Sequence, residues 1–501
     1  MNIKGFRRWI ALAGSLTLAF ALIFLARPIF LLGRAWLRDK PAVEALPSNH
    51  VDDASRLNRT EVAEVWSIPS DPAAAERQLR DLLALAHSKQ LRIAIAGARH
   101  TMGGHTIFPD GIVLNMLPFN HMELNLETET LHVGAGARWS EIIPYLDGYG
   151  YSVSIMQSNN DFSVGGSLSV NCHGWQPNRA PIASTVESFR LMKSDGVILR
   201  CSRIENAELF SLALGGYGLF GIIMDVELKV VPNERYQPKA EVLTYDNYVS
   251  RFAERVDADP AAGMAYGRLC VVPGEHTFLR EAVLTVFVRS PCEREKIPLL
   301  RDAGYATLRR EVFRAQIGSE AGKQLRWRAE KEFGELFSDK YFSRNQLLNE
   351  TAGVYQEQNI DRTDILQEYF IPTAQVVSFL DRARAIIPKH RGDLLNVTVR
   401  NIKEDKDTFL RYADRDMFGF VMLFNQARGQ EDDRRMEEMT QELIDAALSC
   451  GGRYYLPYRL HATEAQFEKA YPKAQTWFER KRHYDPDGIF QNQFYTKYGE
   501  H

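Results

Sequence analysis

The fold is decided by a stretch in which an apolar run passes into a glycine-containing loop, Ile93-Ala94-Ile95-Ala96-Gly97-Ala98-Arg99-His100-Thr101-Met102-Gly103-Gly104. The apolar residues 93–96 predict a short buried strand, and the glycines predict a loop directly after it. Glycine adopts backbone angles that other residues avoid, so several N–H groups of such a loop can converge on an anion. Taken alone, the stretch indicates either a phosphate-binding loop or an ordinary strand-to-turn junction.

Small residues dominate a second stretch, Asp161-Phe162-Ser163-Val164-Gly165-Gly166-Ser167-Leu168-Ser169-Val170-Asn171-Cys172-His173-Gly174. Small side chains allow a flat ligand to approach the backbone closely. His173 is compatible with contact to such a ligand, and equally with a core position in which a backbone carbonyl satisfies the imidazole.

A third stretch, residues 213–223, contains a literal G-x-G-x-x-G pattern from Gly216 to Gly221. A dinucleotide-binding Rossmann site needs that pattern to follow a strand and open a helix. Here a helix-like segment, 206–214, precedes the pattern and a strand-like segment, 222–230, follows it. The order is reversed, and we reject a Rossmann site.

In their order along the chain, the three stretches resemble the vanillyl-alcohol oxidase family, whose FAD-binding domain is also called the p-cresol methylhydroxylase (PCMH) type. The resemblance covers about residues 60–235. In that family a strand leads into a loop around the FAD pyrophosphate, and the histidine of this loop is frequently bonded to the flavin 8α-methyl group. The resemblance therefore implies FAD as the cofactor, with His100 in the attachment position.

This chain departs from the family pattern at two places. Arg99 stands where many relatives have glycine immediately before the histidine. Relatives with a second covalent link carry a cysteine just before the second stretch, where this chain has polar residues over 158–161. We therefore expect at most one link, and we expect Cys172 to be a small packing residue.

A turn-forming segment near the C-terminus, residues 483–492, resembles the D-P-x-G-x-F-x-N ending of aldonolactone and alditol oxidases. That resemblance implies that residues 455–501 return to the first domain, although a surface turn without ligand contact is the alternative. The cofactor-binding residues implied by the family are Gly97, Ala98, Arg99, His100, Thr101, Met102, Ser163, Gly165, Gly166, Ser169, His173, Gly174, Gly221, Ile222, Ile223 and Asn492.

The substrate pocket leaves a weaker signal in the sequence. Residues 368–372 resemble an E-Y-x-x-P element in the substrate domains of related oxidases. Glu368 and Arg400 are the candidate catalytic residues, because an acid and a base among apolar neighbours can orient a hydroxylated substrate or accept its proton. A structural ion pair is the alternative. The spacing of His100, His105 and His121 fits no metal-ligand pattern, and no metal site is expected.

Length and composition set the frame for these motifs. The 501 residues exceed the roughly 250 to 300 at which single cores stop growing. The mixture of short strands and helices predicts an α+β fold. We expect the following divisions: a transmembrane helix at 9–32, a linker at 33–58, an FAD-binding domain at 59–235, a substrate or cap domain at 236–454, and a returning segment at 455–501.

Charge and cysteine usage restrict the partners. A net charge of −3 shows no basic excess, so a nucleic-acid partner is not expected, and five cysteines without a C-x-x-C pair disfavour a zinc site. The uncharged apolar run from residue 9 to 26 is about long enough to cross a bilayer, which predicts a single N-terminal membrane anchor. Cations flank the run on both sides, which leaves its orientation undecided.

The resemblance implies an FAD-linked oxidase or dehydrogenase. Its expected reaction is hydride transfer from a hydroxyl- or amine-bearing small molecule to flavin N5, with oxygen or a membrane component as electron acceptor. Two alternatives stay open. One is a carbon–carbon double-bond reductase of the sterol-reductase type that uses NADPH, and the other is a non-catalytic module that retains FAD.

Overall fold

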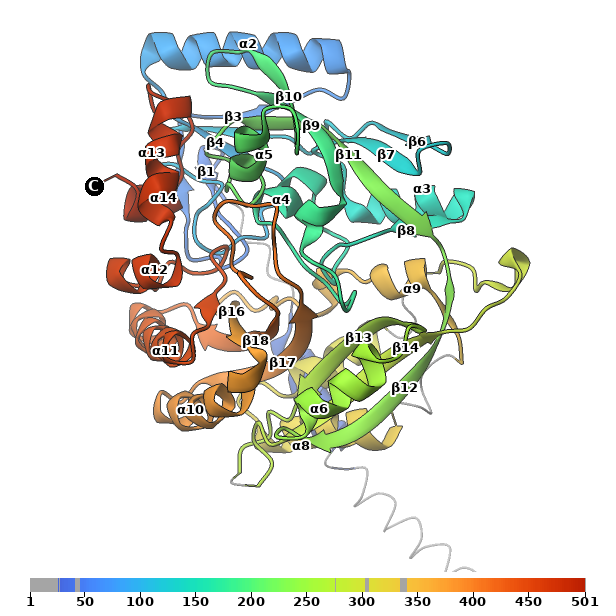
Figure 1. The fold of residues 1–501 in the computed structure, drawn as a ribbon. Helices are drawn as coiled ribbons and strands as arrows, with labels where there is room; N and C mark the ends of the chain where they lie inside the picture. Colours follow the sequence, from blue (N-terminus) through green and yellow to red (C-terminus); the bar gives the residue numbers. More distant parts are fainter. Residues whose placement is uncertain are drawn as a thin grey trace, which may run out of the picture.

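A computed structural model describes residues 26, 28–40, 46–274, 276–301, 306–333 and 340–500. Figure 1 shows two bodies stacked one above the other. The upper body, residues 50–232, carries two larger sheets and a short strand pair, β1 (His50–Val51) with β2 (Thr60–Glu61), and the lower body, residues 235–454, carries one large sheet. Helices and strands alternate through both, which confirms a mixed helix-and-strand chain.

The first sheet of the upper body contains the strand that the opening stretch predicted. Its three parallel strands are β3 (Glu64–Ser67), β5 (Ile112–Asn115) and β4 (Ile93–Ala96), in that order. Helix α2 (Pro72–Lys89) packs its buried leucines against this sheet, and Asp71 caps it by accepting a hydrogen bond from the backbone N–H of Ala74. The loop after β4 therefore leaves a rigid strand.

The second sheet of the upper body has six strands. Its order is β10-β9-β11-β7-β6, and β8 also pairs with β11. The strands are β6 (Met122–Asn125), β7 (Thr130–Gly134), β8 (Tyr151–Val153), β9 (Val186–Met192), β10 (Ile198–Ser202) and β11 (Ile222–Pro232). Helix α5 (Ala207–Ala213) precedes β11, with the glycine pattern between them. This is the reversed order that led us to reject a Rossmann site.

The lower body is built on an eight-stranded antiparallel sheet of order β15-β12-β14-β13-β17-β18-β16-β19. The strands are β12 (Arg235–Thr244), β13 (Ala262–Leu269), β14 (Glu281–Arg289), β15 (Phe342–Ser343), β16 (Arg362–Pro372), β17 (Asp393–Ile402), β18 (Met417–Ala427) and β19 (Arg453–Tyr454).

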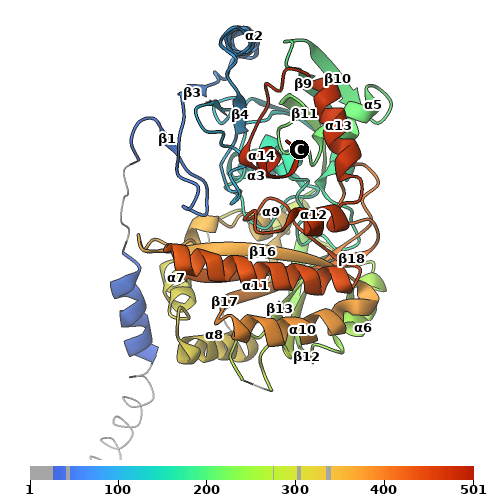
Figure 2. The same cartoon turned by 90° about the vertical axis from the view of Figure 1, so that its left-hand side faces the viewer.

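Helices cover one face of this lower sheet. Figure 2 shows α10 (Val376–Lys389) and α11 (Gln430–Ser449) lying along it. Gln367 donates to Thr440 of α11, and Tyr369 packs against Phe379 of α10. Because side chains alternate across a strand, Glu368 and Phe370 point to the other face, toward the upper body.

The C-terminal segment lies beside the upper body (Figure 1). It contains α12 (Glu464–Ala470), α13 (Ala474–Tyr484) and α14 (Gln493–Tyr498). Phe490 forms a parallel bridge with Ile93 of β4, and the backbone N–H of Gln491 donates to the Ile93 carbonyl at 3.0 Å. The segment thus adds a connection to the strand that precedes the glycine loop.

The prediction of a membrane anchor over residues 9–32 is wrong. Within the part of the chain that the structure describes, no helix combines the length and the apolar character needed to cross a bilayer. Residues 9–25 and 27 of that segment lie outside the described residues. The described remainder belongs to a helix over 28–38, in which Leu31 and Ala35 pack against Ala315 of the lower body. Those apolar side chains bury against protein, and the predicted membrane localisation falls with the anchor.

Candidate active site

A cavity of about 340 Å³ lies where the upper body, the lower body and the C-terminal segment meet. Its upper wall consists of the loop after β4, the stretch from 157 to 173 and part of the third glycine stretch. Its lower wall consists of side chains from the lower sheet and from the helices α7 (Ala306–Arg314) and α8 (Glu320–Phe333). This position between bodies is where ligand sites commonly form.

The loop after β4 packs directly against helix α4 (Val164–Ser169). Ser163 caps this helix, and its hydroxyl accepts from the backbone N–H of Gly166. A Cβ at Gly97 would lie 2.0 Å from the Ser163 Oγ atom. A larger residue at position 97 would displace the Ser163 hydroxyl from its place on α4, so the first two glycine-containing stretches form a single closely packed cradle.

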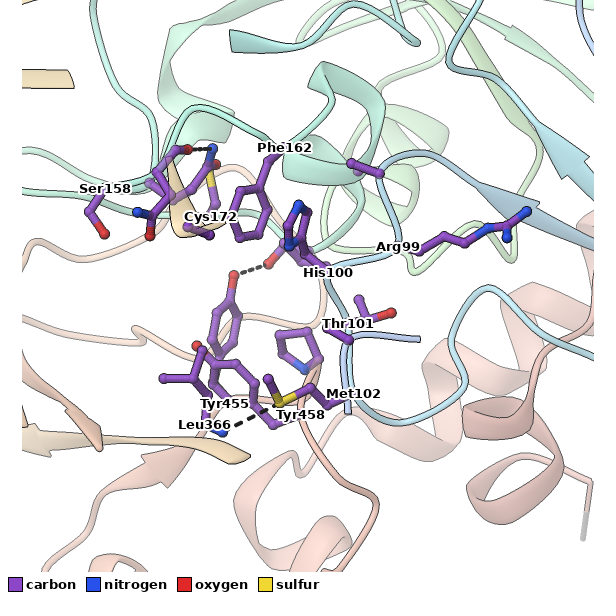
Figure 3. A pocket seen from close by; sticks show the side chains of 18 of the residues that line it. Arg99, His100, Thr101, Met102, Ser158, Phe162, Cys172, Leu366, Tyr455 and Tyr458 are labelled. Atoms are coloured by element: carbon purple, nitrogen blue, oxygen red, sulfur yellow. Dashed lines mark hydrogen bonds between the residues drawn. The ribbon is translucent and has the colours of Figure 1, made fainter. Parts of the chain in front are cut away.

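His100 and Arg99 both line the cavity, and their side chains point in different directions. Figure 3 shows His100 beside Phe162, with the Arg99 side chain directed to the other side of the loop. The two rings stack with centroids 4.1 Å apart and an interplanar angle of 20°. Burial lowers the pKa of His100 below its usual value near 6.5, against the opposing effect of Asp161. The imidazole is therefore neutral at pH 7.

Arg99 has a φ of 56°, in the left-handed region that favours glycine. A side chain costs about 1 to 2 kcal/mol in that region. This conformation explains why a glycine suits the same place in the family pattern, and it shows that arginine can occupy it without blocking His100.

The upper wall fits a large ligand that carries phosphates. Thr101 and Thr106 both line the cavity, and their buried hydroxyls have no hydrogen-bond partner among the described residues. Gly218 also lines it, with a φ of +74° that favours glycine. Free hydroxyl donors beside small residues and a backbone loop suit a dinucleotide.

An acid-base cluster occupies the lower wall. The Nε2 atom of His173 lies 2.7 Å from Oε1 of Glu368, and both side chains are buried. The Tyr458 hydroxyl donates to Oε2 of Glu368 at 3.4 Å. Burial and the Glu368 carboxylate hold the pKa of Tyr458 well above 10, so this phenol stays protonated. Arg400 donates to the His173 carbonyl at 3.2 Å and to the Ser158 hydroxyl at 3.0 Å.

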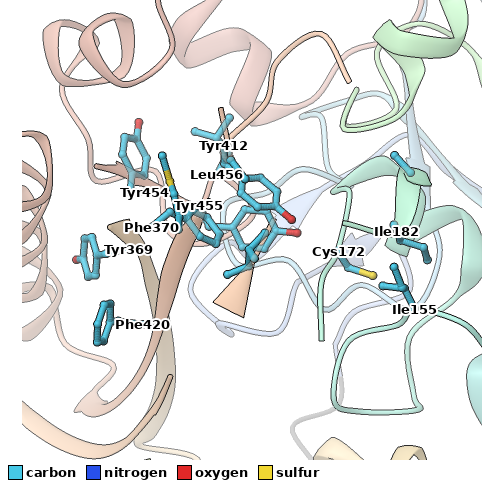
Figure 4. Packing of buried hydrophobic residues seen from close by; sticks show 14 of the residues in the cluster. Ile155, Cys172, Ile182, Tyr369, Phe370, Tyr412, Phe420, Tyr454, Tyr455 and Leu456 are labelled. Carbon is cyan, nitrogen blue, oxygen red and sulfur yellow. The ribbon is translucent and has the colours of Figure 1, made fainter. Parts of the chain in front are cut away.

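Aromatic residues hold the two walls together beside this cluster. Figure 4 shows Phe370, Tyr412 and Tyr455 gathered between the lower sheet and Cys172. Phe370 stacks on Tyr412 at 4.2 Å, and the hydroxyls of Tyr412 and Tyr455 each donate at 2.7 Å to backbone carbonyls of the second glycine stretch. Burial raises the pKa of the Cys172 thiol to about 12, so this cysteine is an unreactive thiol in the wall.

Most of the predicted cofactor residues line this one cavity. The lining includes Gly97, Ala98, Arg99, His100, Thr101, Met102, Ser163, Gly165, Gly166, Ser169, His173, Gly221 and Ile223. Gly174, Ile222 and Asn492 do not line it. A Cβ at Gly174 would lie 1.9 Å from the Met156 carbonyl oxygen, Ile222 is buried in the core, and Asn492 caps α14 and donates to the Tyr217 carbonyl. Direct cofactor contact by each residue stays a prediction.

The predicted catalytic pair also lines the cavity, and the sequence did not identify its neighbours. Glu368 comes from β16 and Arg400 from β17, which flank β18 on either side, and both contact His173. The lining residues that sequence reasoning missed include Trp175, Arg268, Arg326 and Tyr458. Arg268 lies on β13, and no local pattern indicates which face of that strand meets the cavity.

The three histidines considered as metal ligands are not brought together. His105 stacks near Phe494, while His121 lies near His132 and Asp225, whose ligand atoms all fall within 4.8 Å of one another. The Asp225 carboxylate is already bonded to the Arg190 guanidinium. A cation there would have to compete with that arginine.

Comparison with known proteins identifies the cofactor. Residues 73–202 match a protein family described as an FAD binding domain. The chain is 30% identical to L-gulonolactone oxidase of Mus musculus over 156 residues, which are 31% of this chain and 35% of that protein. It is 22% identical to cytokinin dehydrogenase 1 of Arabidopsis thaliana over 442 residues, 82% and 74% of the two chains.

A third relative, D-arabinono-1,4-lactone oxidase of Debaryomyces hansenii, is 27% identical over 188 residues, 35% of this chain and 34% of that protein. The chain thus spans about a third of the length of the lactone oxidases that it matches. The matched region contains β4, the glycine loop and α4. The predicted cofactor, FAD, is confirmed.

Proposed function

We propose that this chain is an FAD-dependent oxidoreductase that oxidises a small molecule bearing a hydroxyl or amine group. The observation that carries the proposal is a buried carboxylate, Glu368, that lines the same cavity as the glycine loop. FAD, when bound, supplies the two-electron acceptor for the carbon being oxidised. The protein has to hold the cofactor, orient the substrate and remove its proton.

Residues of the upper wall hold the cofactor. Backbone N–H groups over 97–101 hold the pyrophosphate, and the hydroxyls of Thr101 and Thr106 donate to the cofactor. We assign residues 59–235 to the PCMH type of FAD-binding domain, and residues 236–454 to the substrate domain. The order of the three glycine-containing stretches and their shared cavity support this assignment.

Residues of the lower wall handle the proton. Glu368 accepts the proton of the substrate hydroxyl, and His173 and Tyr458 hold its two carboxylate oxygens in place. Arg400 is a positioning residue, because it contacts the His173 carbonyl and Ser158. A base held by two partners in a water-poor cavity needs little reorganisation during proton transfer.

The functional test mixes the FAD-loaded protein with a candidate substrate in the absence of oxygen. Reduction of the flavin is measured as a loss of its absorbance. The names of the relatives make aldonolactones and cytokinins the first compounds to test, with alditols and benzylic alcohols after them. We expect at least one to bleach the flavin while NADPH does not. Bleaching by NADPH alone would replace the proposal with a reductase, and no bleaching by any compound would replace it with a non-catalytic FAD module.

We also propose that a ring nitrogen of His100 is bonded to the flavin 8α carbon. The support is a neutral imidazole inside the cofactor cavity, stacked on Phe162. Precipitation of the loaded protein with acid should leave the yellow colour in the pellet, on a peptide that contains His100. The variant His100→Ala should release FAD to the supernatant. Free FAD from the unaltered protein would overturn the bond and leave FAD binding intact.

A further inference from the structure

We infer that the substrate carries an anionic group, a carboxylate or a phosphate monoester, which Arg268 and Arg326 bind in the lower part of the cavity. The inference rests on the proposed function, because it concerns the molecule that the enzyme oxidises. Both arginines line the same cavity as His100 and Glu368. One ligand can therefore reach from the acid-base cluster toward the two guanidinium groups.

The two guanidinium groups lie close together and share an acceptor. Arg268 of β13 donates to the Asn396 side-chain oxygen at 2.5 Å, and Arg326 of α8 donates to the same oxygen at 3.2 Å. Arg326 also donates to the Leu395 carbonyl at 3.0 Å. These acceptors are neutral, so they satisfy hydrogen bonds without cancelling charge. Two guanidinium groups that are close enough to share one acceptor repel each other, unless an anion lies between or beside them.

The carboxylates nearby do not balance the arginines. Glu330 forms an ion pair with Arg268 at 2.9 Å, and Glu350 pairs with Arg309 at the rim. No carboxylate of the described residues forms such a pair with Arg326. Of these three guanidinium groups, that of Arg326 thus has no carboxylate in direct ion-pair contact among the described residues. A partly buried cation without a counter-charge is costly, and a bound anion removes that cost.

A neighbouring acidic pair is held by other partners. Glu357 and Asp364 also line the cavity, but both lie within ion-pair distance of the buried Arg314. Their carboxylates further accept hydrogen bonds from the Asn425 amide. Neither carboxylate forms an ion pair with Arg326, whose pKa burial and the field of Arg268 lower to about 10.

An aromatic ring packs against each of the two guanidinium groups. The Arg326 guanidinium carbon lies 4.7 Å from the Phe313 ring centre, and that of Arg268 lies 5.3 Å from the Tyr266 ring centre. Tyr266 in turn packs on Trp175 at 4.8 Å. The Trp175 indole N–H is buried without an acceptor among the described residues. The ligand that fits has an apolar middle and an anionic end that accepts several N–H donors.

The test measures binding to the FAD-loaded protein through the change in flavin absorbance, with no turnover required. The probes are 4-(hydroxymethyl)benzoate, phenyl phosphate and the neutral analogue 4-methylbenzyl alcohol. At least one anion should bind about tenfold more tightly than the neutral alcohol, the factor expected for a charge-assisted hydrogen bond. Tighter binding of the benzoate identifies a carboxylate site, and tighter binding of phenyl phosphate identifies a phosphate site. Equal binding of all three probes would overturn the inference.

Substitutions then test whether Arg326 is responsible for the tighter binding of anions. Arg326→Gln should reduce the ratio of anion to neutral affinity to about one, and Arg326→Lys should retain part of it because the charge remains. Arg328→Gln is the matched control, since Arg328 lies on the same helix and is exposed. A ratio that survives in Arg326→Gln would overturn the inference. A wild-type protein that prefers the anion but whose flavin no substrate reduces would refute the proposed function and leave the anion site standing.

Discussion

The two walls of the cavity differ in what they are made of. The upper wall is made largely of residues from three short glycine-containing stretches, packed so closely that a Cβ at Gly97 would meet the Ser163 hydroxyl. The lower wall is made of long side chains from strands far apart in the sequence, such as Glu368 and Arg268. Cofactor recognition is therefore a local property of the chain, whereas substrate recognition depends on how the lower sheet is assembled.

The largest effect should come from the lower wall, in the variant Glu368→Gln. Without the carboxylate the substrate proton has no acceptor, and we expect anaerobic flavin reduction to slow by about 10² to 10⁴-fold. The FAD content should stay unchanged, because Glu368 belongs to the opposite wall. Stopped-flow absorbance measures the rate, and absorbance after denaturation measures the FAD. A variant that reduces its flavin at the normal rate would remove Glu368 from its proposed role.

The corresponding change in the upper wall is Gly97→Ala, which should affect FAD retention. The new methyl group would lie 2.0 Å from the Ser163 hydroxyl oxygen, so the loop and α4 must separate. We expect the free energy of unfolding to fall by about 1 to 3 kcal/mol, as for other overpacked sites, and FAD to be lost on gel filtration. Gly148→Ala is the control, since nothing lies within 4 Å of a Cβ there. Normal FAD retention in Gly97→Ala would show that the cradle tolerates separation.

This difference between the walls also explains what could be predicted from the sequence. The strand at 93–96, the loop after it and the order around Gly216 follow from local patterns, and the structure contains them as expected. Glu368 and Arg400 were found through a short motif and a charge among apolar residues. Arg268 was missed because its role depends on which face of the lower sheet meets the upper body. Arg326 of α8 and Trp175 of a loop were missed because their roles depend on contacts between elements far apart in the sequence, and no local pattern specifies such contacts.

The prediction of a membrane anchor was wrong for a related reason. An apolar run indicates that its residues are buried, but it does not indicate whether lipid or protein covers them. In the described part of the predicted segment, Leu31 packs against Ala315, a residue distant in the sequence, while Ile29 and Phe30 are exposed. Hydropathy depends on neighbouring residues alone, so it could not foresee a partner from the lower body.

The free energy of unfolding should depend on pH through a histidine buried between the upper wall and the C-terminal segment. His105 is fully buried against Tyr217 and Phe494, and burial lowers its pKa from 6.5 to about 3. The unfolded chain therefore takes up a proton below about pH 6.5 that the folded protein refuses. The free energy of unfolding should fall by about 1.4 kcal/mol per pH unit from this group between pH 6 and 4.

The matched variant for this prediction is His105→Phe, which keeps an aromatic ring and removes the titrating group. Urea unfolding at pH 7 and pH 5 should show a difference smaller by about 2 kcal/mol in the variant than in the wild type. An equal dependence on pH in both proteins would mean that His105 is protonated in the folded state, and that the joint between Tyr217 and Phe494 is more open to water than the structure shows.

The smallest effect concerns Arg99, a non-glycine residue of the upper wall with a positive φ. Arg99 has a φ of 56°, and its side chain points away from His100. Arg99→Gly should relieve backbone strain and raise the free energy of unfolding by up to about 1 kcal/mol, after the loss of side-chain contacts is included. Flavin retention and the proposed bond at His100 should persist, because the loop needs the left-handed conformation and not the guanidinium. Loss of FAD in this variant would show that the Arg99 side chain takes part in cofactor binding.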